Sequence, residues 1–175
     1  MSANVEYPTD SGLLAHAVVK IGKLVRRIKA AGGAVRTGFR DRSRSAVTTV
    51  HSLAAKLRLR GAQAKDEAQA TVLRITGELN DLAQRSSLDA YPVLDNARRA
   101  LRRVAGRARG RLRRAIDELA TTVERVHRVI AQTRRRIGGD KPTSPTRIVS
   151  LHDPDARPII KADSGNRSSS ATRHR

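Results

Sequence analysis

The sequence lacks cysteine and tryptophan altogether, and its aromatic residues are limited to two tyrosines and one phenylalanine. The absence of cysteine excludes disulfide scaffolds, zinc fingers, iron–sulfur sites and thiol nucleophiles, and it fits a cytoplasmic protein. The chain also lacks the run of about 18 apolar residues that a membrane-spanning helix needs, so we expect no membrane partner. Because large aromatic side chains usually dominate a globular core, we expect narrow buried seams of Leu, Ile, Val and Ala between helices.

Acidic residues are the other scarce class. The chain has 36 Lys and Arg against 16 Asp and Glu, which gives a formal net charge of +20. Such an excess predicts attraction to polyanions, above all nucleic acid, whatever the fold. The charge is densest between Ala97 and Arg114, where half of the residues are arginine and none is acidic: Arg98, Arg99, Arg102, Arg103, Arg107, Arg109, Arg111, Arg113 and Arg114.

These nine arginines form the candidate nucleic-acid-binding site. A guanidinium group matches the geometry of a phosphate through two parallel hydrogen bonds, and affinity for DNA should fall steeply as salt rises. No aromatic residue lies between the arginines, so we expect contact with the phosphate backbone and weak sequence specificity rather than base stacking. A solvated helix face rich in arginine, with no ligand, is an equally weighted alternative.

Apolar residues recur at helical spacing over most of the first 137 residues, which predicts an all-α fold. Any of Thr9, Asp10 and Ser11 can cap the first helix, and Gly32-Gly33 is interpreted as its end. Farther along, one stripe continues across Gly61, whereas Pro92 predicts a kink or break between residues 86 and 92. The predicted helices occupy residues 10–31, 42–85 (as one long helix or two abutting ones), 93–105 and 110–137.

The last predicted helix has the most regular pattern. Its apolar positions alternate at spacings of four and three residues, as in a coiled-coil seam: Leu112, Ile116, Leu119, Val123, Val126, Ile130, Thr133 and Ile137. Such a seam must be covered, and short connections favour antiparallel neighbours. We therefore predict an elongated antiparallel helical hairpin or bundle with coiled-coil-like seams, whose heptads also allow homo-oligomers.

The character of the sequence changes after Gly139. Residues 138–161 are predicted to form a loop and a short strand over 147–151, with Ile148 and Val149 as its apolar core. Residues 162–175 are rich in Ser and Arg and contain no Leu, Ile or Val, which predicts a disordered tail.

Catalytic and metal-binding patterns are weak. None of His16, His51, His127, His152 and His174 lies four residues from another, so no metal site or cofactor is predicted. Asp153 and Asp155 could hold Mg²⁺, but a turn beside Pro154 is the preferred interpretation. Neither a phosphate-binding glycine loop nor a GxSxG nucleophile motif is present.

Two segments resemble bacterial insertion-sequence transposases with a DDE catalytic domain. NVEYPTDSGLL, residues 4–14, is similar to a stretch in which the first catalytic strand runs into YPTDSGLL. RIVSLHDPDARPIIK, residues 147–161, is similar to the VSLHDPDARPIRKG segment of the same family. Between them, residues 24–30 and 96–101 match LVRRIKA-like and NARRAL-like pieces of the family's arginine-rich helical region.

The resemblance implies an RNase-H-like catalytic domain with an early helical insertion. Intact members carry out DNA transposition, in which carboxylate-bound Mg²⁺ ions assist strand cleavage and transfer. No residue of this chain matches the catalytic carboxylates, and Asp10, which matches a motif residue, is interpreted as a helix cap. We therefore expect a truncated, catalytically inactive fragment with residual non-specific DNA binding, in which residues 1–9 are an extended leader from the end of a catalytic strand.

The C-terminal tail is interpreted as a frameshift product. Residues 162–175 can be back-translated so that reading from the third base gives RLGKPVEFGYKAQ, which is the manner in which the family's segment continues. A one-base deletion near codon 162 would produce this result, and the gene sequence tests it. The alternative function is that of a small basic coiled-coil protein, which either binds nucleic acid or associates with itself as a structural element.

Overall fold

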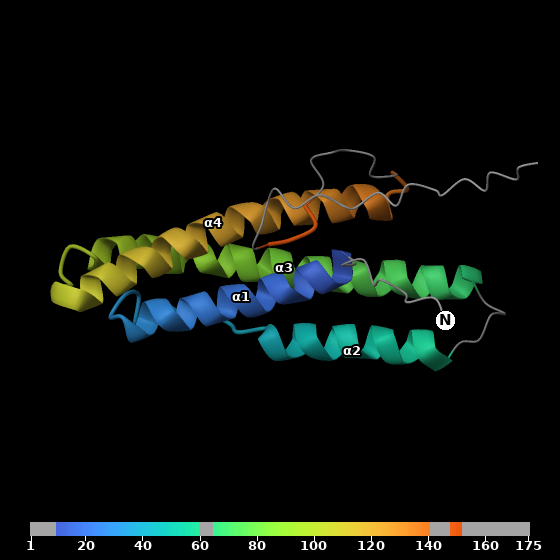
Figure 1. Ribbon diagram of the computed structural model, residues 1–175, viewed down its shortest axis with the longest axis horizontal. Helices are drawn as coiled ribbons and strands as arrows, with labels where there is room; N and C mark the ends of the chain where they lie inside the picture. The colour runs from blue at the N-terminus through green and yellow to red at the C-terminus, as the bar shows by residue number, and fades with distance from the viewer. Residues whose placement is uncertain (1–9, 60–64, 141–147, 152–175) are drawn as a thin grey trace, which may run out of the picture.

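The chain folds into helices packed side by side. The computed structural model describes residues 10–59, 65–140 and 148–151, and within these ranges it contains four helices and no strand (Figure 1). The helices are α1 (Asp10–Ala30), α2 (Ser43–Leu59), α3 (Lys65–Ala100) and α4 (Gly106–Ile137). The prediction of an all-α fold is confirmed. No helix in these ranges has both the length and the apolar character needed to cross a membrane.

Successive helices run in opposite directions, so α1 and α3 are parallel to each other and antiparallel to α2 and α4 (Figure 1). Helices α1, α3 and α4 all pack against one another, whereas α2 contacts only α1 and α3. The molecule is therefore an elongated three-helix bundle, with the shorter α2 covering part of the α1–α3 groove and making no contact with α4.

The apolar stripes predicted for the first and last helices form the core. Each predicted position of α1 is at most 1% exposed: Leu14, Val18, Ile21, Val25 and Ile28. The α4 seam is buried from Leu112 to Thr133, and only its last member, Ile137, is 38% exposed. Ala115, Thr122 and Val129 add a second buried row at seven-residue spacing, because α4 packs against two helices at once.

The middle of the chain departs from the predicted helix boundaries. The apolar stripe over 42–85 belongs to two helices, which was the second of the two predicted alternatives, but they are antiparallel rather than abutting, because the chain reverses direction between Leu59 and Lys65. A stripe has the same period before and after a reversal, so periodicity does not reveal it. The last helix also begins at Gly106 rather than 110, and the connection from α3 is residues 101–105.

The predicted break near Pro92 does not occur, and 93–105 is not a separate helix. Helix α3 continues through Pro92 to Ala100, with Ser86 and Ser87 fully buried. A proline removes the hydrogen bond to the carbonyl group four residues earlier, here that of Leu88. Pro92 and Leu88 are both exposed, so water can replace the missing donor, while buried Val93 and Ala97 keep the helix packed.

Glycine pairs end α1 and α4, as predicted. After α1, the backbone N–H of Gly33 donates to Ile28 O at 2.9 Å and that of Gly32 donates to Lys29 O at 3.0 Å. Gly32 has a φ of +86°, which completes a Schellman motif that few other residues could adopt. Gly139 ends α4 in the same way, with a φ of +96°.

The segment 148–151 is not the strand that the sequence predicts. Ile148 and Leu151 are buried, at 5% and 3% exposure, and the segment lies along α4. The side-chain amide of Gln132 accepts a hydrogen bond from Ile148 N at 3.0 Å, and Arg125 Nη1 donates to Leu151 O at 2.8 Å. Polar side chains of α4 thus satisfy the backbone that a neighbouring strand would otherwise pair. The predicted leader 1–9 and tail 162–175 lie outside the described residues.

Candidate nucleic-acid interface

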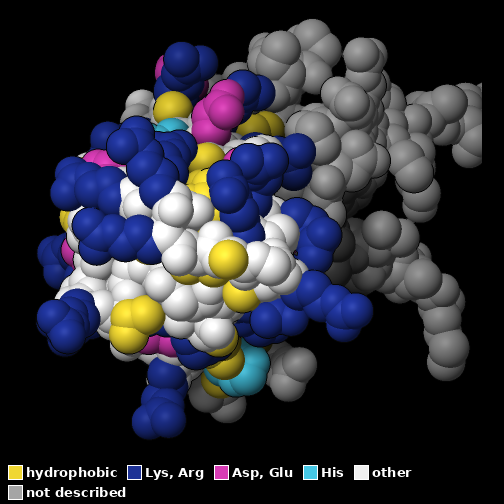
Figure 2. Space-filling view, turned by 90° about the vertical axis from the view of Figure 1, so that its left-hand side faces the viewer, with side chains coloured by type: hydrophobic (Ala, Val, Ile, Leu, Met, Phe, Trp, Pro, Cys, Tyr) yellow, Lys and Arg dark blue, Asp and Glu magenta, His cyan; other side chains and the backbone are white. Residues whose placement is uncertain are grey.

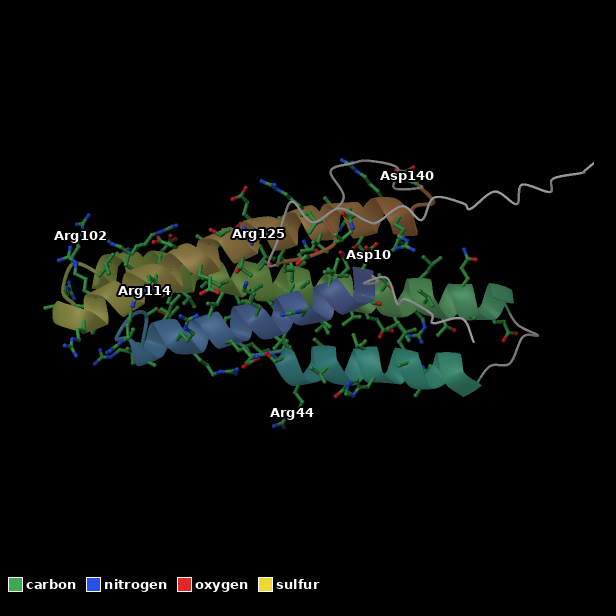
Figure 3. All side chains as sticks on the ribbon, viewed as in Figure 1. Asp10, Arg44, Arg102, Arg114, Arg125 and Asp140 are labelled. Atoms are coloured by element: carbon green, nitrogen blue, oxygen red, sulfur yellow. The ribbon has the colours of Figure 1, made fainter. Side chains whose placement is uncertain are left out.

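The nine arginines of the predicted site all lie at one end of the bundle. The last turn of α3 carries Arg98 and Arg99, the connection carries Arg102 and Arg103, and the first turns of α4 carry the others. All nine side chains are exposed. Figure 3 shows Arg102 and Arg114 at this end, far from Asp140 at the opposite end. The antiparallel pairing of α3 and α4 folds one continuous stretch of sequence around the tip, which we call the arginine-rich end.

The charge of the arginine-rich end is almost uncompensated. Of these nine arginines, only Arg98 forms an ion pair, with Asp95 at 3.6 Å. The other eight have no acidic partner among the described residues. Glu118, the first acidic residue of α4 that faces α1, already forms ion pairs with Arg27 at 2.9 Å and Lys20 at 3.8 Å. In Figure 2, which looks onto this end, Lys and Arg side chains surround a central area of backbone and apolar atoms.

The structure adds a turn that the sequence did not assign to this site. The connection from α1 to α2 passes the same end, because Gly33 packs closely against Leu112 of α4 and Ala97 of α3. It contributes the exposed side chains of Val35 and Arg36. In the sequence, only Gly32-Gly33 pointed to this turn, as the end of the first helix. Nothing in the sequence indicated that the turn lies beside residues 98–104.

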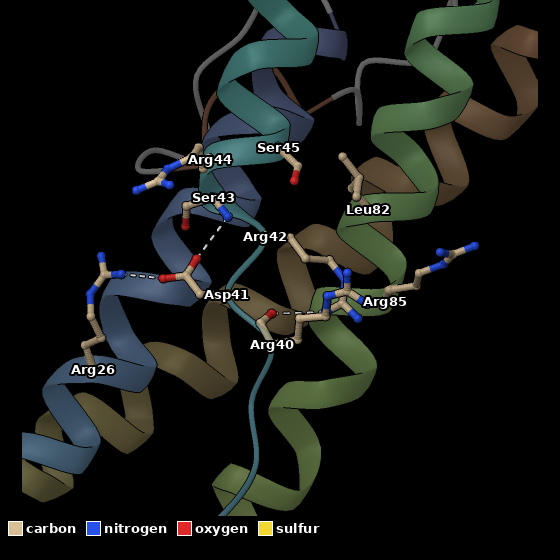
Figure 4. A pocket seen from close by; sticks show the side chains of 9 residues that line it. All are labelled: Arg26, Arg40, Asp41, Arg42, Ser43, Arg44, Ser45, Leu82 and Arg85. Carbon is tan, nitrogen blue, oxygen red and sulfur yellow. Dashed lines mark hydrogen bonds and ion pairs between the residues drawn. The ribbon is translucent and has the colours of Figure 1, made fainter.

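A second basic region lies where α2 begins. An open pocket of about 610 Å³ is lined by five arginines, one acidic residue and neighbouring side chains (Figure 4). Two of the arginines are compensated: Arg26 of α1 pairs with Asp41, and Arg42 pairs with Asp89 of α3 at 2.6 Å. These pairs fasten the start of α2 to both of its neighbours, so we interpret this region as chiefly structural.

Asp41 is the centre of that attachment. Its Oδ1 atom accepts a hydrogen bond from Ser43 N at 2.9 Å, which satisfies a backbone donor at the start of α2. Partial burial of the carboxylate opposes ionisation, but the nearby hydroxyl of Ser43, the hydrogen bond from its backbone N–H and the charge of Arg26 outweigh it. The pKa of Asp41 is therefore lowered below its ordinary value.

Replacing Asp41 with asparagine should lower the free energy of unfolding at pH 7 by about 0.5–1 kcal/mol, because asparagine keeps the cap but loses the charge. A group whose pKa is lowered by folding stabilises the fold above its unfolded pKa and loses that contribution as pH falls. The difference between Asp41→Asn and wild type should thus be full above the ordinary aspartate pKa of about 4 and disappear as the pH falls through the lowered pKa of Asp41. Urea unfolding across pH measures it. Asp95→Asn, at an exposed ion pair, is the control, and an equal or pH-independent difference would contradict the assignment.

Residues considered for catalysis or metal binding do not come together. His16, His51 and His127 are exposed on three different helices, and His127 lies beside Tyr91 with a ring-centroid distance of 6.0 Å. Within the described ranges no group of three His, Cys, Asp or Glu residues could hold a metal ion. His152, Asp153, Asp155 and His174 lie outside these ranges.

Asp10, interpreted from the sequence as a helix cap, stands at the first turn of α1 and is 2% exposed. Its carboxylate accepts hydrogen bonds from Gln132 Nε2 at 3.1 Å and Arg136 Nη1 at 3.3 Å, both on α4. The residue therefore ties the start of α1 to α4.

In comparisons with protein-family models, curated proteins and solved structures, nothing matches this chain.

Proposed function

We propose that the protein binds the phosphate backbone of DNA through its arginine-rich end, with weak sequence specificity. The observation that carries the proposal is the exposure of nine arginines at one end of a helical bundle, eight of them without an acidic partner among the described residues. Guanidinium groups that are exposed and uncompensated retain their full attraction for phosphate, and each contact releases counterions from DNA.

We further propose that these helices correspond to the helical region of an insertion-sequence transposase. An inserted unit needs its two ends close together, so that the host domain can continue across it. Here the side chain of Gln132 bonds both Asp10, in the first motif of the resemblance, and Ile148, in the second. Asp10 and Ile148, one residue from each motif, therefore contact the same side chain of α4, and this closeness supports the proposal. The proposal gives no residue of this chain a catalytic role.

The alternative function, a structural protein that associates with itself, requires that the apolar heptad positions of α4 be exposed to a second copy. The α4 heptads that suggested it are occupied within the chain, since Leu112 through Thr133 are buried against α1 and α3. Among the seam positions only Ile137 is substantially exposed. The buried seam thus argues against assembly through these heptads.

A binding titration across salt concentration tests the proposal. The affinity of the full chain for a short DNA duplex should fall by about a thousandfold or more between about 50 and 200 mM salt, as for proteins with six or more phosphate contacts. Duplexes of unrelated sequence should bind within a few-fold of each other. Failure to bind at low salt would contradict the proposal, and salt-independent dimers would favour the structural alternative.

A further inference from the structure

An apolar side chain is held outward at the arginine-rich end, close to Arg36, Arg99 and Arg103. Val35 is 61% exposed, more than any other large hydrophobic residue whose burial the structure describes. It occupies a tight turn closed by a hydrogen bond of 3.0 Å from Thr37 N to Ala34 O. Ala34 has a φ of +52°, a left-handed conformation that is unfavourable for residues other than glycine. A strained backbone thus presents an apolar group to solvent.

The turn is fixed to the bundle on both sides. Thr37 accepts two hydrogen bonds, one from Asn96 Nδ2 of α3 to its hydroxyl at 3.0 Å and one from Lys29 Nζ to its backbone carbonyl at 2.7 Å. On the other side, Gly33 is packed against α3 and α4 and has no room for a side chain. The exposure of Val35 therefore belongs to the folded state and does not come from a loose loop.

Beside the turn lies an open hollow of about 620 Å³ between residues 32–37 and the end of α3. Its lining includes apolar Val35, Ala100 and Val104, the guanidinium-bearing Arg36, Arg99 and Arg103, and the neutral polar Thr37 and Asn96. All three arginines are exposed and none has an acidic partner among the described residues. The hollow thus combines a small apolar surface with three uncompensated cations.

We propose that this hollow receives one strand of duplex DNA, with a deoxyribose against Val35 and the flanking phosphates on Arg36, Arg99 and Arg103. The inference rests on the proposed function and extends the binding surface to the α1–α2 turn. A DNA strand alternates apolar sugar edges with anionic phosphates, which is the alternation that the hollow complements. A second copy of this chain carries a charge of +20 and would be repelled, and an apolar protein surface would leave three guanidinium groups unpaired.

Two substitutions separate the apolar contact from the ionic one. Val35→Ser should weaken binding to a short duplex by about three- to tenfold at every salt concentration and leave the salt slope unchanged, because burial of apolar surface releases no counterions. Arg36→Gln should instead reduce the slope by about one unit. Val47→Ser, at a residue of α2 that is 41% exposed and outside the hollow, is the matched control and should bind as wild type. Circular dichroism verifies that all three variants are folded.

The outcomes distinguish this inference from the function on which it rests. If wild type shows no salt-dependent binding, the proposed function itself fails. If wild type binds with a steep slope but Val35→Ser binds equally well, the assignment of the hollow is wrong while DNA binding stands. Dimers in analytical ultracentrifugation that Val35→Ser dissociates would assign the turn to self-association and overturn the inference.

Discussion

Replacing Arg102, Arg107, Arg111 and Arg114 with glutamine should lower the affinity for duplex DNA by about a thousandfold at about 0.1 M salt. Arg107, Arg111 and Arg114 follow one another at helical spacing on α4, and Arg102 lies in the adjoining connection. None of the four pairs with an acid among the described residues, so their removal breaks no ion pair there. Glutamine keeps the helix propensity of arginine, and the free energy of unfolding should change by less than about 1 kcal/mol.

The dependence of affinity on salt concentration tests the quadruple variant more directly than a single affinity does, because its slope counts the phosphate contacts that are lost. Each arginine that no longer binds a phosphate should reduce the logarithmic slope by about one, so the quadruple variant should have a slope smaller by roughly four units. The control removes the same charge elsewhere, by replacing Arg44, Lys56, Arg85 and Arg135, which form no ion pair among the described residues, with glutamine. Those side chains are exposed and lie away from the arginine-rich end. Equal reductions in both variants would mean that DNA responds to net charge alone, which would refute a localised interface.

The first and last helices, α1 and α4, could be predicted from sequence because their apolar stripes agree with the residues that mark their ends. Asp10 marks the start of α1, and Gly32-Gly33 and Gly138-Gly139 mark the ends of α1 and α4, with a stripe of the correct period in each helix. A stripe specifies which side of a helix is buried, and two glycines specify where it ends. Neither depends on a distant part of the chain.

The helix boundaries in the middle of the chain could not be predicted from sequence, because they depend on tertiary packing. Nothing in the periodicity distinguishes a continuous helix over 42–85 from two antiparallel ones, and the reversal is stabilised by α1, on which both α2 and α3 pack. Pro92 is a strong local breaker, but its exposed side of α3 tolerates the missing hydrogen bond. Residues 147–151 were expected to be a strand remnant, but Ile148 and Leu151 are instead buried against α4, where Gln132 and Arg125 bind their backbone.

Part of the candidate site could likewise be predicted from sequence and part could not. The nine arginines lie in one short stretch of sequence, so they stay close together in any fold and their clustering could be predicted. Val35 and Arg36 are some sixty residues earlier in the sequence, and only the packing of Gly33 against Leu112 and Ala97 brings them to the same end. The attachment of Asp41 to Arg26 is likewise a tertiary contact with another helix, which a single sequence does not reveal.

Gly33→Ala should lower the free energy of unfolding by about 2–3 kcal/mol and the melting temperature by on the order of 10 °C. A Cβ atom at Gly33 would collide with Leu112 Cδ1, and it would lie 3.1 Å from Ile28 Cγ2 and 3.3 Å from Ala97 Cβ. Leu112, Ile28 and Ala97 are all fully buried. None can move aside without disturbing the core where α1, α3 and α4 meet.

Gly38→Ala, in the same connection, is the control for that substitution. A Cβ atom at Gly38 would meet no atom within 4 Å, and its backbone does not have a positive φ. Alanine there restricts the unfolded chain without a clash, so stability should be unchanged or increase by up to about 1 kcal/mol. Thermal unfolding of the two variants measures the difference. Equal melting temperatures would show that Gly33 does not hold the α1–α2 turn against the bundle, and the fixed position of Val35 would then lose its support.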